Sequence, residues 1–161
     1  MQLRVMGSQT CIDMMNAMGG EGLHMPQGDV YSAIQMGTID GAENNIITYV
    51  DLIQYEVAKY YNYTGHLMVP DELVISNTVL AKMSAEDQEA LKKVCTESIT
   101  YCFDTINAQR AEYEKVAIEK GVIFTEADVP AFQAACADLI NSVANKNDAS
   151  KAAYEAILSQ R

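Results

Sequence analysis

The run SAEDQEALKKVCTESITYCFDTINAQRAEYEKVAIEK, from Ser84 to Lys120, contains neither proline nor glycine, and Gly121 follows it directly. Ser84 is a typical N-cap residue, and the acidic side chains of Glu86 and Asp87 suit the positive end of a helix dipole. Apolar side chains recur at helical spacing: Leu91, Val94, Cys95, Ile99, Cys102, Ile106, Val116 and Ala117. The run therefore predicts one helix of roughly 35 residues, about 50 Å long at about 1.5 Å per residue.

A helix of this length is unusual in one compact domain, where helices average about 12 residues. Such a helix usually braces more than one body, or its chain belongs to a larger structure. Two of the four cysteines, Cys95 and Cys102, share one face of it, and we expect both to be buried as small apolar residues. None of the cysteines forms a C-x-x-C pair and neither histidine lies near them in sequence, so the spacing of a zinc site is absent.

The rest of the chain alternates short apolar runs with amphipathic stretches, a pattern typical of α/β proteins. Strands are expected at residues 3–6, 23–25, 39–43, 73–76 and 122–125. Helices are expected at residues 9–18, 28–37, 46–60, 129–143 and 149–159. The sequence thus predicts an α/β fold with one very long helix.

Composition excludes several classes of partner. The 161 residues carry a net charge of −11 and give a pI near 4.4, which disfavours binding to nucleic acid or to an anionic membrane surface. No apolar run approaches the roughly 20 residues that span a bilayer, and no signal peptide is visible after Met1. A small anion remains compatible, because one buried arginine can dominate its own pocket.

Motifs of known enzyme classes are lacking. The two histidines, His24 and His66, stand beside no recognisable nucleophile signature, and we expect structural roles for them. Gly19-Gly20-Glu21-Gly22 lacks the spacing of a phosphate-binding loop and is typical of a helix end. The sequence therefore favours a protein that is not an enzyme and needs no cofactor.

Arg4 is the most informative single residue, because it interrupts the apolar run from Leu3 to Met6. Strand alternation directs its side chain away from the face of Leu3 and Val5. Two interpretations stand: a solvated arginine on an edge strand, or a guanidinium held rigidly to bind a carboxylate through two parallel hydrogen bonds. The segment from Asp40 to Asn45 is likewise either a turn with an asparagine cap or the source of an amide that orients a ligand.

In their order along residues 3–130, five motifs resemble those of the solute-binding proteins of TRAP (tripartite ATP-independent periplasmic) transporters. They are Arg4-Val5-Met6-Gly7-Ser8, Met25-Pro26-Gln27-Gly28-Asp29-Val30-Tyr31, the stretch from Ala33 to Asn44, the stretch from Tyr55 to His66, and the helix start from Ser84 to Gln88. The resemblance implies a two-lobed α/β binding protein that closes around a hinge, without a cofactor or a metal.

The resemblance also implies the ligand site. The arginine that Arg4 matches forms a salt bridge with the substrate carboxylate, and the asparagine that Asn44 matches fixes that arginine and the ligand. Gly7 and Glu43, within the same motifs, are expected to be ligand-binding residues. Gln27 stands where the family commonly has phenylalanine and could hydrogen-bond a more polar ligand, so the class of carboxylate stays open. Asn45 replaces a proline and is expected to alter only the turn.

Members of this family are about twice as long and begin with a secretory signal. The chain is therefore expected to be a carboxyl-terminal half, working outside the cytoplasm with a TRAP permease. Residues 1–69 and 121–161 would form the second ligand-binding lobe, and residues 70–120 a crossover strand from the first lobe plus the bracing helix. We expect the isolated chain to dimerise or to exchange strand 73–76 and the long helix between copies.

Two other functions stay open. One is a hydrolase or lyase whose catalytic residues lie in the missing half. The other is a truncated receptor that serves as a sensory or interaction module without transport.

Overall fold

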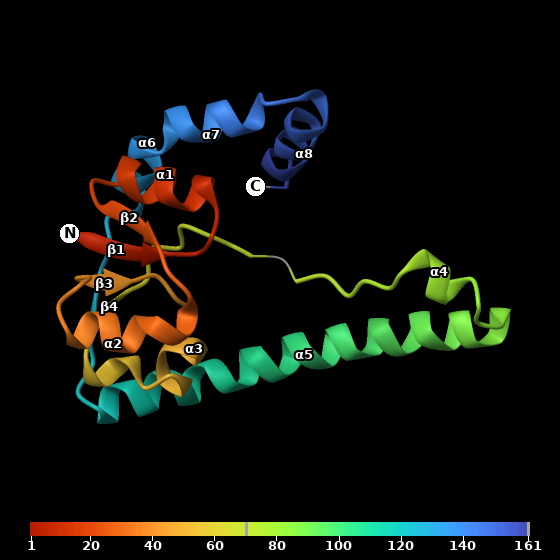
Figure 1. The fold of residues 1–161 in the computed structure, drawn as a ribbon, viewed down its shortest axis with the longest axis horizontal. Helices are drawn as coiled ribbons and strands as arrows, with labels where there is room; N and C mark the ends of the chain where they lie inside the picture. The colour runs from red at the N-terminus through yellow and green to blue at the C-terminus, as the bar shows by residue number, and fades with distance from the viewer. Residues whose placement is uncertain (70, 161) are drawn as a thin grey trace.

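The computed structural model describes residues 1–69 and 71–160 (Figure 1). Its main sheet has three parallel strands in the order β2-β1-β3: β1 (Gln2–Val5), β2 (Glu21–His24) and β3 (Gly41–Ala42). Arg4 on the central strand pairs in register with Leu23 on one side and Ala42 on the other. The expected strands near residues 3, 23 and 41 are therefore present.

Helices cover both faces of this sheet. The chain passes through α1 (Gln9–Ala17) from β1 out to β2, and then through η1 (Gln27–Asp29) and α2 (Val30–Gln35) back across β1 to β3. Because parallel crossovers are right-handed, these opposite directions place α1 and α2 on opposite faces, as Figure 1 shows. Each face has its own small buried core, built around Val5, Cys11 and Met15 on the α1 face and Val30, Ala33 and Ile39 on the α2 face.

A second layer joins the sheet to the long helix. It contains α3 (Ile46–Asp51), η2 (Gln54–Glu56) and a two-stranded parallel sheet of β4 (Tyr60–Asn62) and β5 (Ile123–Thr125). Its core consists of Ile46, Tyr49, Val50, Ala117 and Val122. The carboxyl end of the long helix is thereby packed against α3.

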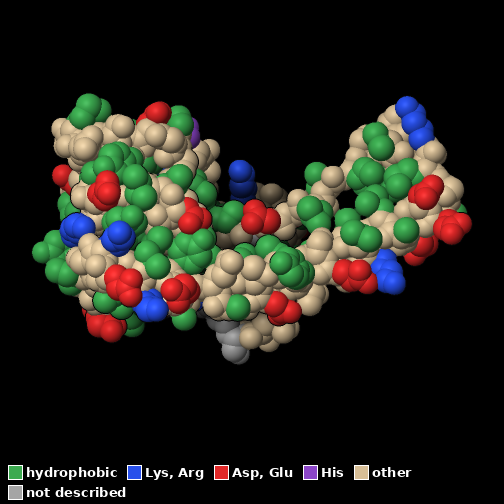
Figure 2. Space-filling view, turned by 90° about the horizontal axis from the view of Figure 1, so that it is seen from below, with side chains coloured by type: hydrophobic (Ala, Val, Ile, Leu, Met, Phe, Trp, Pro, Cys, Tyr) green, Lys and Arg blue, Asp and Glu red, His purple; other side chains and the backbone are tan. Residues whose placement is uncertain are grey.

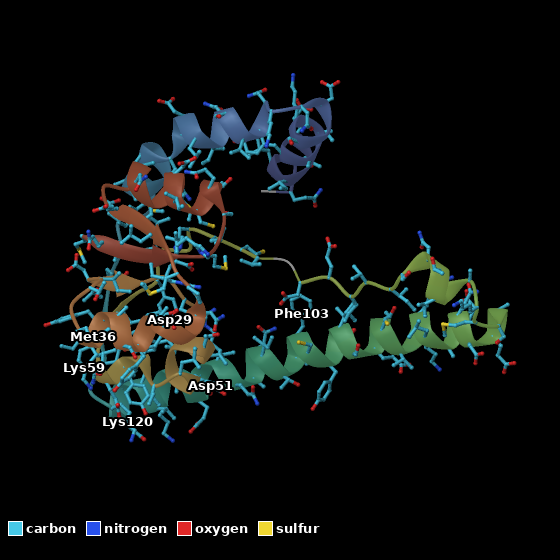
Figure 3. The ribbon with its side chains drawn as sticks, viewed as in Figure 1. Asp29, Met36, Asp51, Lys59, Phe103 and Lys120 are labelled. Atoms are coloured by element: carbon cyan, nitrogen blue, oxygen red, sulfur yellow. The ribbon has the colours of Figure 1, made fainter. Side chains whose placement is uncertain are left out.

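The predicted long helix is confirmed as α5 (Ala85–Glu119), and the Ser84 hydroxyl accepts a hydrogen bond from the amide of Asp87 at 3.1 Å. At the other end Lys59 Nζ donates to the Lys120 carbonyl at 2.9 Å, and Figure 3 labels both residues there. The amino-terminal half of α5 projects beyond the rest of the molecule (Figure 1). Residues 71–83, which include α4 (Asn77–Leu80), run out to its far end.

The carboxyl-terminal segment folds into three helices, α6 (Val129–Ala135), α7 (Ala137–Ala144) and α8 (Asp148–Leu158), of which α7 packs against α1. The helix expected at residues 129–143 is thus divided at Cys136, whose Sγ lies 3.9 Å from the Met14 carbonyl. None of the described helices is long and apolar enough to cross a membrane.

Several expectations are wrong in detail. The helix expected at residues 46–60 ends after Asp51, because Ile53 adopts a left-handed conformation with φ of 48°. Residues 73–76 form no strand, since no other strand lies beside them in the described part of the chain to pair with their backbone. Cys102 is exposed and Cys95 only half-buried, because their part of α5 projects. The expected lobe limits at residues 70 and 161 lie outside the described residues.

Candidate ligand-binding site

The candidate site lies at the carboxyl ends of the three parallel strands. The strand order reverses at β1, because the chain leaves it toward β2 and returns past it to β3. In open α/β sheets the crevice at such a reversal is where ligands bind. Gly7, His24 and Asn44 follow or end the three strands at this edge.

Arg4 is only 6% exposed and belongs to the central strand. The interpretation of Arg4 as a solvated arginine on an edge strand is therefore wrong. Its register neighbours Leu23 and Ala42 pack into the core beneath α2, and paired residues of parallel strands share a face. The guanidinium is thus held on the α2 face, where a buried cation is costly unless an anion accompanies it.

Within residues 1–69 and 71–160, the hydrogen bonds of the Arg4 guanidinium engage only one of its three nitrogens. Its Nε donates to the backbone carbonyl of Met25 at 2.9 Å, which anchors the guanidinium. Its Nη1 lies 3.9 Å from Oε1 of Glu43, beyond hydrogen-bond distance. Among the described residues no hydrogen bond to either terminal nitrogen is found. The terminal nitrogens therefore keep donors suited to a bound carboxylate.

Glu43 has a second partner that fixes it. The same oxygen, Oε1, accepts a hydrogen bond from the backbone amide of Met6 at 3.0 Å, and the Glu43 side chain is 11% exposed. Glu43 therefore connects the ends of β1 and β3 while placing a negative charge beside Arg4. The structure brings these two predicted site residues together.

Asn44 is held by residues that follow it in the chain. Its Nδ2 donates to Oε1 of Gln54 at 3.5 Å, and its backbone carbonyl accepts the hydroxyl of Tyr61 at 2.9 Å. No hydrogen bond joins Asn44 to Arg4 within residues 1–69 and 71–160. The orienting partner of Asn44 is Gln54, which is 2% exposed. Sequence reasoning missed Gln54, although a glutamine inside an apolar pattern is a usable signal.

An aromatic cluster supports this side of the site. The ring centroids of Tyr49 and Tyr61 lie 5.1 Å apart, and that of Phe124 lies 5.5 Å from Tyr61. The Tyr49 hydroxyl donates to the Ala58 carbonyl at 2.6 Å, and burial raises the pKa of Tyr49 to about 12. Burial also raises the pKa of Tyr61. The cluster therefore holds the Tyr61 ring where its hydroxyl reaches the backbone carbonyl of Asn44.

Gln27 and Gly7 complete the set of predicted residues. Gln27 begins η1 just beyond β2, and its Nε2 is buried without a hydrogen-bond partner among the described residues. A buried donor without a partner costs the folded protein about 1–3 kcal/mol of stability. The unpaired Nε2 of Gln27 is therefore a donor that a ligand at this edge could engage. Gly7 follows β1 and lies against the ring of His24.

Residues 1–147 match the DctP family, described as bacterial extracellular solute-binding protein, family 7. The chain belongs to this family. The resemblance that the motifs predicted is therefore confirmed, and with it the α/β fold class. Family members are solute-binding proteins of transport systems.

Relatives with known structures are similar over almost the whole chain. A TRAP periplasmic solute-binding protein from Pseudomonas putida F1 with bound D-glucuronate is 39% identical, with a TM-score of 0.86 over 99% of this chain and 50% of that one. One from Sulfitobacter sp. NAS-14.1 with bound β-D-galacturonate is 32% identical, with a TM-score of 0.87 over 94% of this chain and 50% of that one.

A solute-binding protein of Chromohalobacter salexigens is 33% identical over 83% of this chain and 40% of its own length. This DctP-family chain therefore spans about half the length of the relatives that it matches.

Proposed function

We propose that the chain forms part of an extracytoplasmic receptor that captures a hexuronate reversibly and delivers it to a TRAP-type membrane permease. The observation that carries the proposal is the buried guanidinium of Arg4, anchored through Nε to Met25 at 2.9 Å with its terminal nitrogens unbonded among the described residues. Related proteins that are 39% and 32% identical hold D-glucuronate and β-D-galacturonate, both sugar acids with one carboxylate.

The carboxylate is the part of the ligand that Arg4 suits. Each hydrogen bond between charged partners contributes about 1.5–3 kcal/mol, so two parallel bonds give about 3–6 kcal/mol. A micromolar affinity corresponds to about 8.2 kcal/mol. The arginine thus supplies a large share of the binding energy, and other groups must supply the rest.

The sugar hydroxyls are the part that Gln27 and Asn44 suit. An amide offers both donors and an acceptor, as a hydroxyl does, and the buried Nε2 of Gln27 has no partner among the described residues. A phenylalanine at position 27 would offer only an apolar face. The glutamine therefore favours a ligand with many hydroxyl groups over an aliphatic carboxylate.

Residues 1–69 and 121–161 are proposed to form one ligand-binding lobe, with residues 70–120 extending from it to a second lobe. Closure of two lobes would bury the ligand without any covalent step, so we propose a receptor and not an enzyme. The family consists of extracellular solute-binding proteins, which supports a location outside the cytoplasmic membrane.

The projecting part of α5 and residues 71–76 are proposed to associate with a second copy of the chain when the chain stands alone. Val94, Ile99 and Phe103 are 59%, 47% and 65% exposed, and Leu73 and Val74 are 65% and 85% exposed. Figure 2 shows hydrophobic side chains along this projecting part, and Figure 3 labels Phe103 on it. An apolar surface with a neighbouring extended segment of unpaired backbone favours exchange between copies.

A ligand panel followed by NMR tests the proposal on this chain. One lobe offers one wall of the site, so millimolar affinity, about 4 kcal/mol, is expected. D-glucuronate and D-galacturonate should shift the backbone amides of Arg4, Met25 and Asn44, while D-glucose, which lacks the carboxylate, should shift none of them. Equal shifts with D-glucose, or shifts confined to other parts of the chain, would contradict a carboxylate site at Arg4.

A further inference from the structure

The imidazole of His24 occupies space that only a glycine at position 7 leaves open. His24 is the last residue of β2 and pairs in register with Val5, two residues before Gly7. A Cβ on Gly7 would lie 2.8 Å from Cε1 and 3.2 Å from Nδ1 of the His24 ring. Real Cβ atoms do not come so close, so a larger residue at position 7 would require the His24 ring to move from this place.

The backbone of Gly7 does not itself require glycine. The glycines with positive φ are Gly19, Gly37, Gly65 and Gly121, and Gly7 is not among them. An alanine could adopt the Gly7 conformation without strain. What glycine provides at this position is therefore room for the imidazole ring of His24.

The ring nitrogens of His24 are free for a ligand. His24 is exposed, and among the described residues its side chain makes no hydrogen bond. A neutral imidazole carries one donor and one acceptor, which matches a sugar hydroxyl.

His24 and Arg4 flank the same sheet edge from its two faces. Arg4 shares the α2 face with Leu23, and successive strand residues alternate, so His24 shares the α1 face with Val5. Met25, the residue after His24, accepts the Nε hydrogen bond that anchors Arg4. A ligand at the carboxyl ends of β1 and β2 would thus meet Arg4 from one side and His24 from the other.

We infer that His24 is a further ligand-contacting residue, which hydrogen-bonds a hydroxyl group of the sugar acid, and that Gly7 is the positioning residue that seats its ring. The inference rests on the proposed function, and it assigns part of the selectivity of that site for hydroxyl groups to His24. It also replaces the structural role that the sequence alone suggested for His24.

A double-mutant cycle tests the inference on this chain, with D-glucuronate as the probe and NMR titration as the measurement. His24→Ala should weaken binding about three- to tenfold, as the loss of one hydrogen bond does. Gly7→Ala should weaken it similarly, because the new Cβ displaces the ring. The variant carrying both substitutions should bind no more weakly than His24→Ala alone, since the methyl group then has nothing left to displace.

His24→Gln serves as the conservative variant, because it restores a donor and an acceptor and should recover part of the lost affinity. It also keeps the inference testable if Gly7→Ala fails to fold. Unchanged affinity in His24→Ala, or losses that multiply in the double variant, would overturn the inference. A parent chain that does not bind D-glucuronate, or binds it independently of Arg4, would instead overturn the proposed function.

Discussion

The side chains of Arg4 and Glu43 lie side by side without a hydrogen bond between them: Nη1 of the arginine is 3.9 Å from Oε1 of the glutamate, while the backbone amide of Glu43 donates to the Arg4 carbonyl at 3.2 Å. Oε1 of the glutamate accepts the Met6 amide at 3.0 Å instead. The carboxylate thus accompanies the buried cation without occupying the donors of its terminal nitrogens. Such an arrangement is suited to a site that must admit and release a second carboxylate.

Glu43→Gln tests this arrangement. The amide oxygen of glutamine can still accept from Met6, so the local structure should persist, while Arg4 loses its neighbouring negative charge. We expect the free energy of unfolding to fall by about 1–3 kcal/mol, less than the about 3–5 kcal/mol that follows the loss of a tightly bonded buried partner. Added D-glucuronate should restore the missing charge, so its stabilising effect should be larger in this variant than in the parent.

Thermal unfolding with and without D-glucuronate measures both effects. Glu119→Gln, an exposed position at the end of α5, is the matched control and should change neither quantity. An identical ligand-induced shift in parent and Glu43→Gln would show that the Glu43 charge and the ligand do not interact.

Gln54→Met tests the support of Asn44. The Gln54 amide is buried, with one long hydrogen bond to Asn44 at 3.5 Å and an Nε2 without a partner among the described residues, so methionine should change stability by less than about 1 kcal/mol. Asn44 loses its acceptor, and D-glucuronate binding should weaken about two- to fivefold. Gln35→Met on the exposed surface of α2 is the control. Unchanged affinity together with an unmoved Asn44 side-chain amide resonance would remove Gln54 from the site.

Alkaline pH should destabilise the layer that contains Tyr49 and β4, because ionising a buried tyrosine is costly. Burial raises the pKa of Tyr49 to about 12, so its stabilising effect is complete below the ordinary tyrosine pKa of about 10 and is lost as pH rises toward 12. Tyr49→Phe should flatten this loss while lowering stability near pH 7 by about 1–2 kcal/mol, because the Ala58 carbonyl loses its donor. Tyr60→Phe, at an exposed position, should leave the profile unchanged. Denaturant unfolding across pH 7–12 measures the difference, and parallel profiles for parent and Tyr49→Phe would contradict it.

The sequence predicted those features that depend on local pattern. The helix after Ser84 follows from a long stretch without proline or glycine, and a charge inside an apolar strand singled out Arg4, although that pattern alone left a solvated arginine and a ligand-binding arginine both open. Both signals are contained in neighbouring residues. The resemblance to a family then supplied Asn44 and Glu43, which lie where the strands end.

What the sequence missed depends on contacts between distant residues. No local signal predicts the left-handed backbone conformation of Ile53, since isoleucine rarely adopts positive φ. The apolar run 73–76 has strand composition, but a strand also needs a neighbour, and none pairs with it in the part of the chain that is described. The fit of His24 over Gly7 required coordinates, because His24 ends β2 while Gly7 lies in the turn after β1.

Self-association should depend on the projecting part of the molecule. Ile99→Lys combined with Val74→Lys places charges on the exposed apolar surface, so the variant should sediment as a monomer at concentrations where the parent forms dimers. Ser98→Lys, on the same helix, is the control for added charge. A parent chain that sediments as a monomer at every concentration would contradict the proposed association.

The central claim, that Arg4 binds the carboxylate of a sugar acid, is tested most directly by the affinity of Arg4→Lys for D-glucuronate. Lysine keeps the positive charge but cannot offer two parallel donors, so a clamp predicts at least a tenfold loss, with the backbone spectrum otherwise preserved. An Arg4→Lys chain that folds as the parent does and binds D-glucuronate equally well would contradict the claim.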